Sequence, residues 1–335
     1  MKNYLLCCDW GTTSFRLRLV NMENQEVIGE ILSMEGVALT FDNWKALDSN
    51  FSDRRRFFID HLQKQITLLE NKFDVYLDGV AIVISGMASS SIGMHEIPYS
   101  NLPFDLDGNQ LNVYRIDSDD SFMHDILLIS GVKSEHDVMR GEETQLIGLA
   151  ELTDLSVGDK TNVIFPGTHS KHLFIQNKKL TGFQTFMTGE IFKIISTHSI
   201  LKDSIELSVL PDFSEDELAA FRLGVREADS TGILKGLFRV RTNQLFNKLS
   251  KKENALYLSG LLIGSEITNL LDEIHAQLVL CSGNNLFELY KLALDESGLS
   301  ERTTTVSSDM ADRATVAGQI KIFRNQAFIL NNINL

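Results

Sequence analysis

Apolar and polar residues alternate at the start of the chain, on both sides of a turn rich in glycine and hydroxyl side chains. An apolar run over 4–6 comes before the turn, which spans 11–14 (Gly-Thr-Thr-Ser), and apolar residues after it alternate with Arg16 and Arg18. This period of two predicts a β-hairpin. A third strand is expected over 26–32, so the chain begins with three consecutive strands.

The rest of the first half combines a helix, a buried strand and a loop of small residues. Apolar residues recur at helical spacing over 54–69, which predicts an amphipathic helix. The run 79–85 is apolar on both faces, as in a central parallel strand, and it leads into a small-residue loop over 85–93. Further expectations are an irregular region over 95–137 with a strand near 111–116 and an apolar run at 122–129, and a helix from Glu142.

The second half repeats the β-β-β pattern of the first. Strands are expected over 162–165, 173–176 and 180–186, and the first turn between them, at 166–172, again contains Gly-Thr. Further expectations are a helix opened by a capping box at 214–217, a small apolar helix over 258–266, a strand over 278–281, a polar turn at 282–285, a helix from Leu286 and a last helix over 309–323.

Length and composition favour a globular protein of two domains. The chain has 335 residues, 43% of them hydrophobic, and only 4 prolines, so it is long for one domain and shows no disordered linker. We expect a first lobe over 1–152, a second lobe over 153–310, and a terminal helix over 311–335 that packs back at the hinge.

Charge and cysteine usage exclude several classes of partner and site. The net charge of −14 argues against nucleic-acid and anionic-membrane partners. No apolar run approaches the roughly 18 residues of a membrane span and no signal-peptide pattern opens the chain, so a cytoplasmic protein is expected. The three cysteines lie in apolar runs without C-x-x-C spacing and are expected to be buried. An anionic ligand would need local positive charge, and Arg16, Arg140 and Lys171 each lie beside a predicted turn.

The first turn carries candidate phosphate chemistry. Asp9 ends the first strand, and the turn after it offers backbone N–H groups and hydroxyls to a phosphate chain. Asp9 is then placed to hold a magnesium ion, directly or through water. The alternative is an ordinary hairpin whose glycine and serine only suit the turn.

Three later segments also carry candidate chemistry. Ligands of open α/β sheets bind beyond the carboxyl ends of the strands, where the loop 85–93 would lie. A strand, a small polar turn and a helix, as at 278–286, often form a nucleoside or phosphate site. Glu142 or Glu143 is a candidate base for a substrate hydroxyl, with Arg140 as a contact for an anionic group. The alternative for the two glutamates is a structural one, because acidic residues in a first helical turn offset the macrodipole.

The duplicated β-β-β-α pattern with a phosphate turn in each half resembles the actin/hexokinase/Hsp70 superfamily of ATP-binding folds. Within it, five segments resemble the 2-keto-3-deoxy-galactonate kinase family and occur in that family's order. They are DWGTTSFR (9–16), GMASSSIG (86–93), MRGEETQL (139–146), PGTHSK (166–171) and SGLLIG (259–264). The resemblance implies an α/β fold of duplicated ribonuclease-H-like (actin-like ATPase) domains around a nucleotide cleft.

The resemblance also implies ATP- and Mg²⁺-dependent phosphorylation of the 6-hydroxyl of a 2-keto-3-deoxy sugar acid, in the first place 2-dehydro-3-deoxy-D-galactonate. The catalytic candidates are Asp9, which is also the metal candidate, Glu142 and Glu143. The phosphate-binding candidates are Gly11, Thr12, Thr13, Gly167, Thr168, His169 and Lys171. The adenosine-binding candidates are Ser282, Gly283, Asn284, Asn285 and Gly264. The substrate-binding candidates are Arg16, Ser85, Gly86, Met87, Ser89 and Arg140.

Two other functions remain open at this point. One is a kinase that acts on another sugar or sugar acid, and the other is a non-metabolic actin-like ATPase switch. The expected partners are the sugar acid and ATP, and a homodimer is a further option.

Overall fold

The computed structural model describes residues 3–47, 53–155, 159–207 and 213–333, without the side chains of 284–285 and 327–333. The chain divides into two compact units. The first unit comprises 1–155, 178–181 and 312–335, and the second comprises 156–177 and 182–311.

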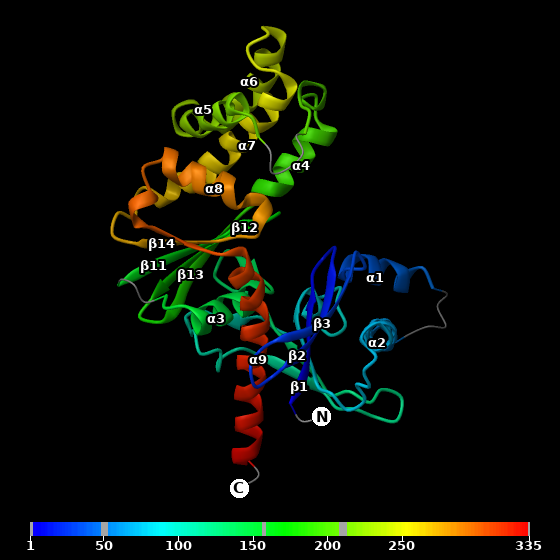
Figure 1. Cartoon of the computed structure of the whole chain (residues 1–335). Coiled ribbons are helices and arrows are strands. Elements are labelled where there is room, and N and C mark those ends of the chain that lie inside the picture. The colour runs from blue at the N-terminus through cyan, green and yellow to red at the C-terminus, as the bar shows by residue number, and fades with distance from the viewer. Residues whose placement is uncertain (1–2, 48–52, 156–158, 208–212, 334–335) are drawn as a thin grey trace. The chain divides into compact units, whose positions relative to one another are not determined.

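The first unit is built on a six-stranded sheet with the order β3-β2-β1-β4-β8-β7, beside a three-stranded sheet with the order β10-β9-β5 (Figure 1). Its elements are β1 (Tyr4–Trp10), β2 (Phe15–Asn21), β3 (Val27–Ser33), α1 (Val37–Lys45), α2 (Arg54–Phe73), β4 (Ile82–Gly86), η1 (Met87–Ser89), β5 (Ser100–Asn101), β6 (Phe104–Asp105), β7 (Val113–Ile116), β8 (Ile126–Ile129), β9 (Val132–Lys133), β10 (Val138–Met139), α3 (Glu142–Leu152) and most of α9 (Ser308–Ile333).

The second unit is built on the other six-stranded sheet, with the order β15-β14-β11-β12-β13-β6. Its elements are β11 (Lys160–Phe165), β12 (Ser170–Gln176), β13 (Lys179–Phe186), α4 (Thr188–His198), η2 (Lys202–Ser204), α5 (Glu215–Thr231), α6 (Ile233–Leu245), α7 (Lys251–Ile267), η3 (Thr268–Leu270), β14 (Gln277–Cys281), α8 (Asn284–Glu296), η4 (Ser300–Arg302) and β15 (Thr303–Val306). The first residues of β13 belong to the first unit, where they pair with β6.

The strand orders of the two large sheets correspond. In each, the first strand of the unit pairs antiparallel with the second and parallel with a later strand, as β1 does with β2 and β4, and β11 with β12 and β14. A further parallel strand follows in both, β8 in one sheet and β15 in the other. The β-β-β repeat predicted from the sequence is therefore confirmed, and it extends to five strands of each sheet, while the sixth strands, β7 and β6, lie at opposite edges.

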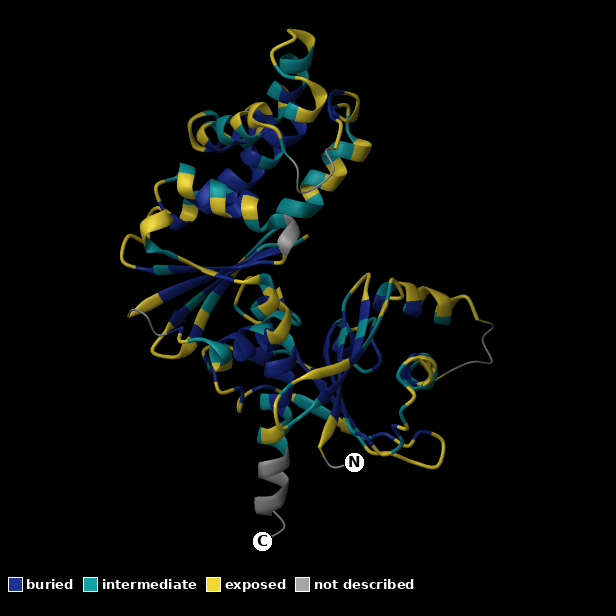
Figure 2. Cartoon of the chain, viewed as in Figure 1, coloured by how far each residue is buried: buried dark blue, intermediate teal, exposed yellow. Residues whose placement is uncertain are grey.

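Each sheet packs its apolar face against helices. In the first unit α2 buries Phe58, Leu62 and Ile66 against the sheet, and each fully buried side chain of this size contributes about 1.5–3 kcal/mol. In the second unit α7 is buried around almost its whole circumference (Figure 2). Gly260 lets α7 approach α5, since an added Cβ would lie 2.1 Å from the carbonyl oxygen of Phe221.

Several elements differ from the sequence-based expectation. Helices α1, α4 and α6 and strand β15 were not predicted. Helix α2 continues to Phe73 and ends at Asp74, whose φ of 52° is left-handed. The region 95–137, expected to be irregular apart from a strand near 111–116 and an apolar run at 122–129, holds the short strands β5 to β9, of which β7 is the expected strand. All three cysteines are buried, as predicted. In the part of the chain that the structure describes, no helix is long and apolar enough to cross a membrane.

Candidate functional site

The carboxyl ends of β1 and β4 bring Asp9 beside the small-residue loop. Parallel pairing places Asp9 opposite Ser85 and Trp10 opposite Gly86. Gly86 has a φ of 90°, and an added Cβ would lie 2.7 Å from the carbonyl oxygen of Trp10 and 3.4 Å from Oδ1 of Asp9. Only glycine fits this close approach without strain, and the Asp9 carboxylate therefore borders the start of the loop.

The environment of Asp9 disfavours its charged form. Burial raises the pKa of Asp9, and the negative charges of Glu142 and Asp312 raise it further, while Arg16 and Arg18 lower it. The net pKa is raised, so burial outweighs the two guanidinium groups. A cation bound at this carboxylate would offset that cost.

The N-terminus of α3 lies against the same loop. Gly141 precedes the helix with a φ of 114°, and an added Cβ would lie 3.5 Å from Cα of Gly86. Glu142 folds back so that its Oε2 accepts a hydrogen bond of 3.0 Å from the backbone N–H of Arg140. Glu143 does the same for the N–H of Gly141, at 3.0 and 2.8 Å. Both side chains thus satisfy backbone donors near the helix start, where the macrodipole favours negative charge.

The two glutamates differ in exposure. Glu143 has no exposed surface, and burial, reinforced by the charge of Glu142, raises the pKa of Glu143 to about 7. Its Oε1 also accepts a hydrogen bond of 3.0 Å from the hydroxyl of Thr144. Glu142 is only half-buried. Of the two base candidates, Glu142 is therefore the one with surface open to a ligand.

Arg140 connects the same loop to an aromatic side chain. Its guanidinium donates to Oγ of Ser89 at 2.5 Å and lies over the ring of Tyr99, 4.3 Å from the centroid. Its Nε is buried and has no hydrogen-bond partner among the described residues. An unsatisfied guanidinium N–H is costly to bury, so this group is suited to an acceptor supplied by a ligand.

Two further substrate candidates, Ser85 and Met87, differ in their exposure. Ser85 has no exposed surface, and the amide of Gln319 on α9 donates to its Oγ at 2.9 Å and to the carbonyl of Cys8 at 2.7 Å. Met87 begins η1 and is half-buried. Ser85 is therefore a buried residue anchored to α9 at the start of the loop, whereas Met87 is partly exposed within the loop.

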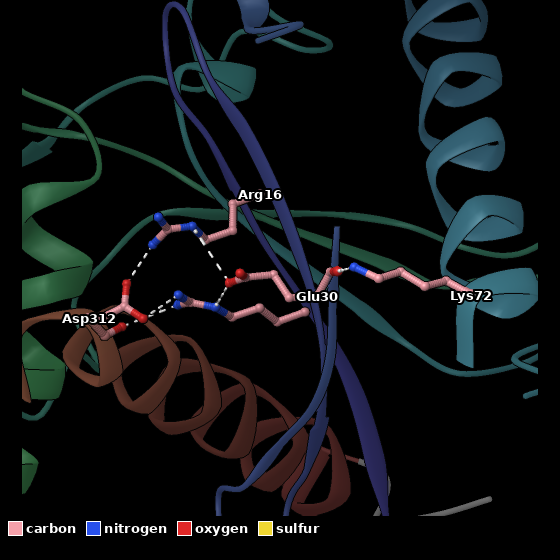
Figure 3. A network of polar contacts seen from close by, with 5 residues as sticks. Arg16, Glu30, Lys72 and Asp312 are labelled. Carbon is pink, nitrogen blue, oxygen red and sulfur yellow. Dashed lines mark hydrogen bonds and ion pairs between the residues drawn. The ribbon is translucent and has the colours of Figure 1, made fainter. Parts of the chain in front are cut away.

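Arg16 is engaged in ion pairs. Its guanidinium lies 2.5 Å from Asp312 and 3.7 Å from Glu30, while Arg18 bridges the same two carboxylates at 2.5 and 2.6 Å (Figure 3). These contacts attach the beginning of the α9 portion in the first unit to strands β2 and β3. The contacts of Arg16 seen here are structural, and its role toward substrate stays a prediction.

The first phosphate turn rests on the start of α1. The N–H groups of Val37 and Ala38 donate to the carbonyls of Gly11 and Thr12, at 2.9 and 3.1 Å. Gly36 lies so close beneath that an added Cβ would be 2.4 Å from the Thr12 carbonyl oxygen. Thr12 and Thr13 themselves are exposed. The turn is thus supported by a helix that the sequence did not reveal.

The second phosphate turn is supported in the same way by α4. An added Cβ on Gly189 would lie 2.7 Å from the carbonyl oxygen of Gly167, and the N–H of Glu190 donates to the carbonyl of Thr168 at 3.0 Å. Thr168 is exposed, and Nε2 of His169 contacts the carboxylate of Glu190. Each Gly-Thr turn therefore rests on a glycine at the start of the helix that follows the third strand.

Two phosphate candidates turn inward. The N–H of Gly167 donates to Oγ of Ser170 at 3.3 Å rather than pointing to solvent. The side chain of Lys171 is 5% exposed, and its Nζ donates to the carbonyl of His169 at 3.3 Å. In this turn, Thr168 and His169 are the exposed members.

The adenosine candidates fall in two places. Ser282 and Gly283 lie at the start of α8, where Oγ of Ser282 donates to the carbonyl of Gly283 at 3.0 Å and Gly283 is exposed. The side chains of Asn284 and Asn285 lie outside the described residues. Gly264 lies in the contact between α7 and α5, where an added Cβ would lie 2.8 Å from Cβ of Ala228.

A cavity in the second unit was missed by the sequence reasoning. It has a volume of about 230 Å³, and its walls come from Gly167, the start of α4, one side of α7 and the first turns of α8. Apolar side chains such as Ala255, Ile263 and Leu289 form most of the surface. Of the segments singled out in the sequence, SGLLIG at 259–264 contributes to this cavity. The cavity as a whole could not be predicted, because its walls come from segments far apart in the chain.

The metal candidate is a single carboxylate. Among the residues that the structure describes, no three His, Cys, Asp or Glu side chains gather in a cluster that could hold a metal ion. Mg²⁺ is commonly held in proteins by one or two carboxylates together with water and substrate phosphates. A lone Asp9 fits that mode and does not fit a structural site made of protein ligands alone.

Comparison with known proteins agrees with the resemblance. A family model described as 2-keto-3-deoxy-galactonokinase matches residues 9–322. A protein of Rhizobium meliloti (strain 1021) named "Probable 2-dehydro-3-deoxygalactonokinase DgoK1" is 31% identical over 333 residues, which cover 93% of this chain and 94% of the relative. The 2-dehydro-3-deoxygalactonokinase of Escherichia coli (strain K12) is 32% identical over 320 residues, with coverage of 93% and 95%.

Solved structures support the same fold. A Sinorhizobium meliloti protein described as a "putative 2-dehydro-3-deoxygalactonokinase" has a TM-score of 0.75 and 30% identity, and the match covers 94% of this chain and 95% of that one. Component A of an Acidaminococcus fermentans (R)-2-hydroxyglutaryl-CoA dehydratase, at 13% identity and a TM-score of 0.50, shares the fold alone. The predicted duplicated α/β fold and the predicted kinase family are confirmed.

Proposed function

The chain belongs to the 2-keto-3-deoxy-galactonokinase family, and we propose that it transfers the γ-phosphoryl group of ATP to the 6-hydroxyl of 2-dehydro-3-deoxy-D-galactonate. The observation that carries this proposal is the gathering of Asp9, Gly86 and Glu142 at the carboxyl ends of β1 and β4, next to a buried guanidinium N–H of Arg140. Such a transfer needs three parts: a carboxylate that holds a metal ion, a base for the hydroxyl proton, and a cation that binds the acid group of the substrate.

Asp9 is assigned to the metal and phosphate side. Phosphoryl transfer passes through a loose transition state with negative charge spread over the phosphoryl oxygens. Asp9 would hold Mg²⁺, which would supply charge neutralisation there when bound. Thr12 and Thr13, exposed at the end of the same hairpin, are assigned to phosphate oxygens, since their hydroxyls and N–H groups suit an anion.

Arg140 is assigned to the carboxylate of the sugar acid. Its stacking on Tyr99 and its hydrogen bond to Ser89 fix the plane of the guanidinium, which leaves its orientation prepared for a planar carboxylate. Met87 and Gly86 lie on the same loop and are assigned to the sugar chain. Ser85 is assigned a supporting role, because it is fully buried under Gln319.

Glu142 is assigned as the base that accepts the proton of the 6-hydroxyl. It is half-buried, and the Asp9 carboxylate is near enough to feel its charge. Glu143 is assigned to the helix start, since it is fully buried and holds the N–H of Gly141. Positioning and charge stabilisation carry more of the rate than the proton transfer does.

The second unit is assigned to the nucleotide. Thr168 and His169 are exposed on a turn that borders the apolar cavity through Gly167. The apolar walls suit the faces of a purine base, and the N-terminus of α8, with Ser282 and Gly283, suits the polar parts of the nucleoside. An ATP-consuming enzyme draws on the cytoplasmic nucleotide pool, and we assign the protein to that compartment.

The test is ATP consumption by the purified chain with Mg²⁺, measured with 2-keto-3-deoxy-galactonate, its gluconate epimer and a panel of neutral sugars. We expect the highest kcat/KM with the galactonate form. Arg140→Lys should raise KM for the sugar acid about tenfold, because an ammonium cannot replace the planar fork. Arg115→Lys, a change at an exposed arginine paired with Asp117 and Asp125, is the matched control and should leave KM unchanged.

Other outcomes would support the other functions. A higher kcat/KM with a neutral sugar would indicate a kinase for a different substrate. ATP hydrolysis at the same rate with and without every acid would indicate an ATPase switch. The homodimer stays a prediction, which the mass measured by light scattering would test.

A further inference from the structure

A buried carboxylate in the second unit is not used by the chemistry assigned above. Glu266 on α7 is 2% exposed, and three side chains from different elements contact its two oxygens. Nε2 of His172 lies 3.0 Å from Oε1, while the hydroxyl of Tyr290 donates to Oε2 at 2.7 Å and that of Thr188 also donates to Oε2. A buried carboxylate is costly unless such partners surround it, so its presence calls for a reason beyond filling space.

One branch of these contacts leads to the second phosphate turn. Oγ of Ser170 lies 2.8 Å from the hydroxyl oxygen of Tyr290, and it accepts the N–H of Gly167 at 3.3 Å. Burial and the neighbouring Glu266 hold the pKa of Tyr290 well above its usual range, so the phenol keeps its proton. The chain of contacts therefore runs from the turn to the carboxylate without a gap.

The donors and acceptors in this series of hydrogen bonds can be assigned from Glu266 back to Gly167. The hydroxyl of Tyr290 donates to Oε2 of Glu266. The Tyr290 oxygen then accepts from Ser170, and the Ser170 oxygen remains free to accept from Gly167. Oγ of Ser170 also lies 3.5 Å from the carbonyl oxygen of Gly167, so this one hydroxyl contacts both backbone groups of Gly167 and fixes the orientation of the turn.

The other branch reaches the same turn through α4. Thr188, which donates to Glu266, is the first residue of α4, and the next residue, Gly189, lies against the carbonyl of Gly167. Tyr290 and Thr188 also line the apolar cavity. Glu266 is thus connected to both ends of the turn, Gly167 and Ser170, and to two side chains in the cavity wall.

We propose that Glu266 is a positioning residue for nucleotide binding, which orients the Gly167–Ser170 turn through Tyr290 and Ser170. This proposal rests on the proposed function, since it takes ATP as the ligand of that turn. The Tyr290 hydroxyl lies between Ser170 and Glu266. Its removal should therefore weaken nucleotide binding without altering a residue that contacts the sugar acid.

The experiment compares Tyr290→Phe with Tyr257→Phe. Tyr257 is an equally buried tyrosine of the same unit whose hydroxyl donates to the part-buried Glu227 at 2.6 Å, so it controls for the loss of one phenol–carboxylate hydrogen bond away from the turn. Readouts are the dissociation constant for ADP by calorimetry, KM for ATP, KM for the sugar acid, and Tm. Glu266→Gln and Ser170→Ala extend the series, and Ser170→Ala serves where the others fail to fold.

We expect Tyr290→Phe to raise the ADP dissociation constant and KM for ATP about tenfold, roughly the effect of losing one hydrogen bond, with KM for the sugar acid unchanged. Tyr257→Phe should lower Tm comparably and leave both nucleotide values within about twofold. Equal effects of the two variants on nucleotide binding would overturn the positioning role while the kinase assignment stands. If the unaltered protein binds no ADP and consumes no ATP, the proposed function itself fails.

Discussion

Asp9 and Arg16 face each other across the first hairpin, as directly paired residues of β1 and β2. Arg16 lowers the pKa of Asp9, yet its guanidinium is bound to Asp312 and Glu30. The carboxylate therefore experiences the arginine as a nearby charge while the hydrogen-bonding groups of Arg16 are used elsewhere.

Replacement of Asp9 should cost more activity than replacement of the base. We expect Glu142→Gln to lower kcat by about 10²-fold, the lower end of what general-base catalysis contributes, and Asp9→Asn to lower it further. The reason is that charge stabilisation dominates a loose phosphoryl transfer. Steady-state kinetics of both variants at saturating ATP provide the measurement, and an equal or reversed order would contradict the role given to Asp9.

Glu143 should make stability depend on pH. Its pKa is about 7 in the folded chain against an ordinary value of 4.5, so between these values the folded state holds a proton that the unfolded state has lost. Its contribution to stability is fully present below pH 4.5 and is lost as pH rises through 7, a difference of about 3 kcal/mol. Glu143→Gln should flatten the fall in Tm between pH 5 and pH 8.5.

The control for this prediction is Glu151→Gln on the same helix. Glu151 is partly exposed and forms an ion pair of 2.8 Å with Lys321. Its replacement should leave the pH profile of Tm parallel to that of the unaltered protein. A Glu143→Gln profile that is also parallel would show that this carboxyl does not titrate as described.

Asp312→Asn should destabilise the first unit. The side chain of Arg18 is 5% exposed and loses one of its two carboxylates, whereas the half-exposed side chain of Asp312 limits the effect, so we expect a loss of about 2 kcal/mol. Asp60→Asn removes the partner of exposed Arg56 and should cost less than about 1 kcal/mol. Urea unfolding of both variants measures the difference, and similar losses would show that the buried guanidinium is not the cause.

Close packing between α3 and α9 should not tolerate a methyl group. An added Cβ on Gly148 would lie 1.7 Å from the carbonyl oxygen of Ala314, and one on Gly318 would lie 1.9 Å from that of Thr144. Gly148→Ala or Gly318→Ala should lower the free energy of unfolding by about 3 kcal/mol or more. Gly283→Ala lies at an open position, the N-cap of α8, where glycine is preferred over alanine, and should cost only about 1 kcal/mol.

Filling the apolar cavity should weaken ATP binding selectively. Ala255→Leu adds bulk to the cavity wall, and we expect KM for ATP to rise about tenfold with KM for the sugar acid unchanged, because the purine loses its space. Ala219→Leu, on an exposed face of α5, is the control and should alter neither KM. An unchanged KM for ATP in folded Ala255→Leu would place the base elsewhere.

Much of the fold was predictable because its signals are local. Alternating side chains around Gly11 and Gly167 revealed both hairpins, and Ser214 with Glu217 forms the predicted capping box. The candidate residues near Asp9 were also recognised, since a carboxylate or glycine at the end of a strand stands out in the sequence. Glu142 and Glu143 could not be separated, because neighbouring glutamates look alike until the burial of each is known.

The sequence by itself determined the two strand repeats, their Gly-Thr turns and the family of the protein, because strand period and turn chemistry depend on residues a few positions apart. Only the tertiary structure decided how those turns are held. Three features connect segments far apart in the chain. They are the packing of Gly36 and Gly189 against the two turns, the cavity beside α7, and the hydrogen bonds that join Glu266 to Gly167. Such contacts depend on how the elements pack, and no local pattern records which distant side chain will fill a given space.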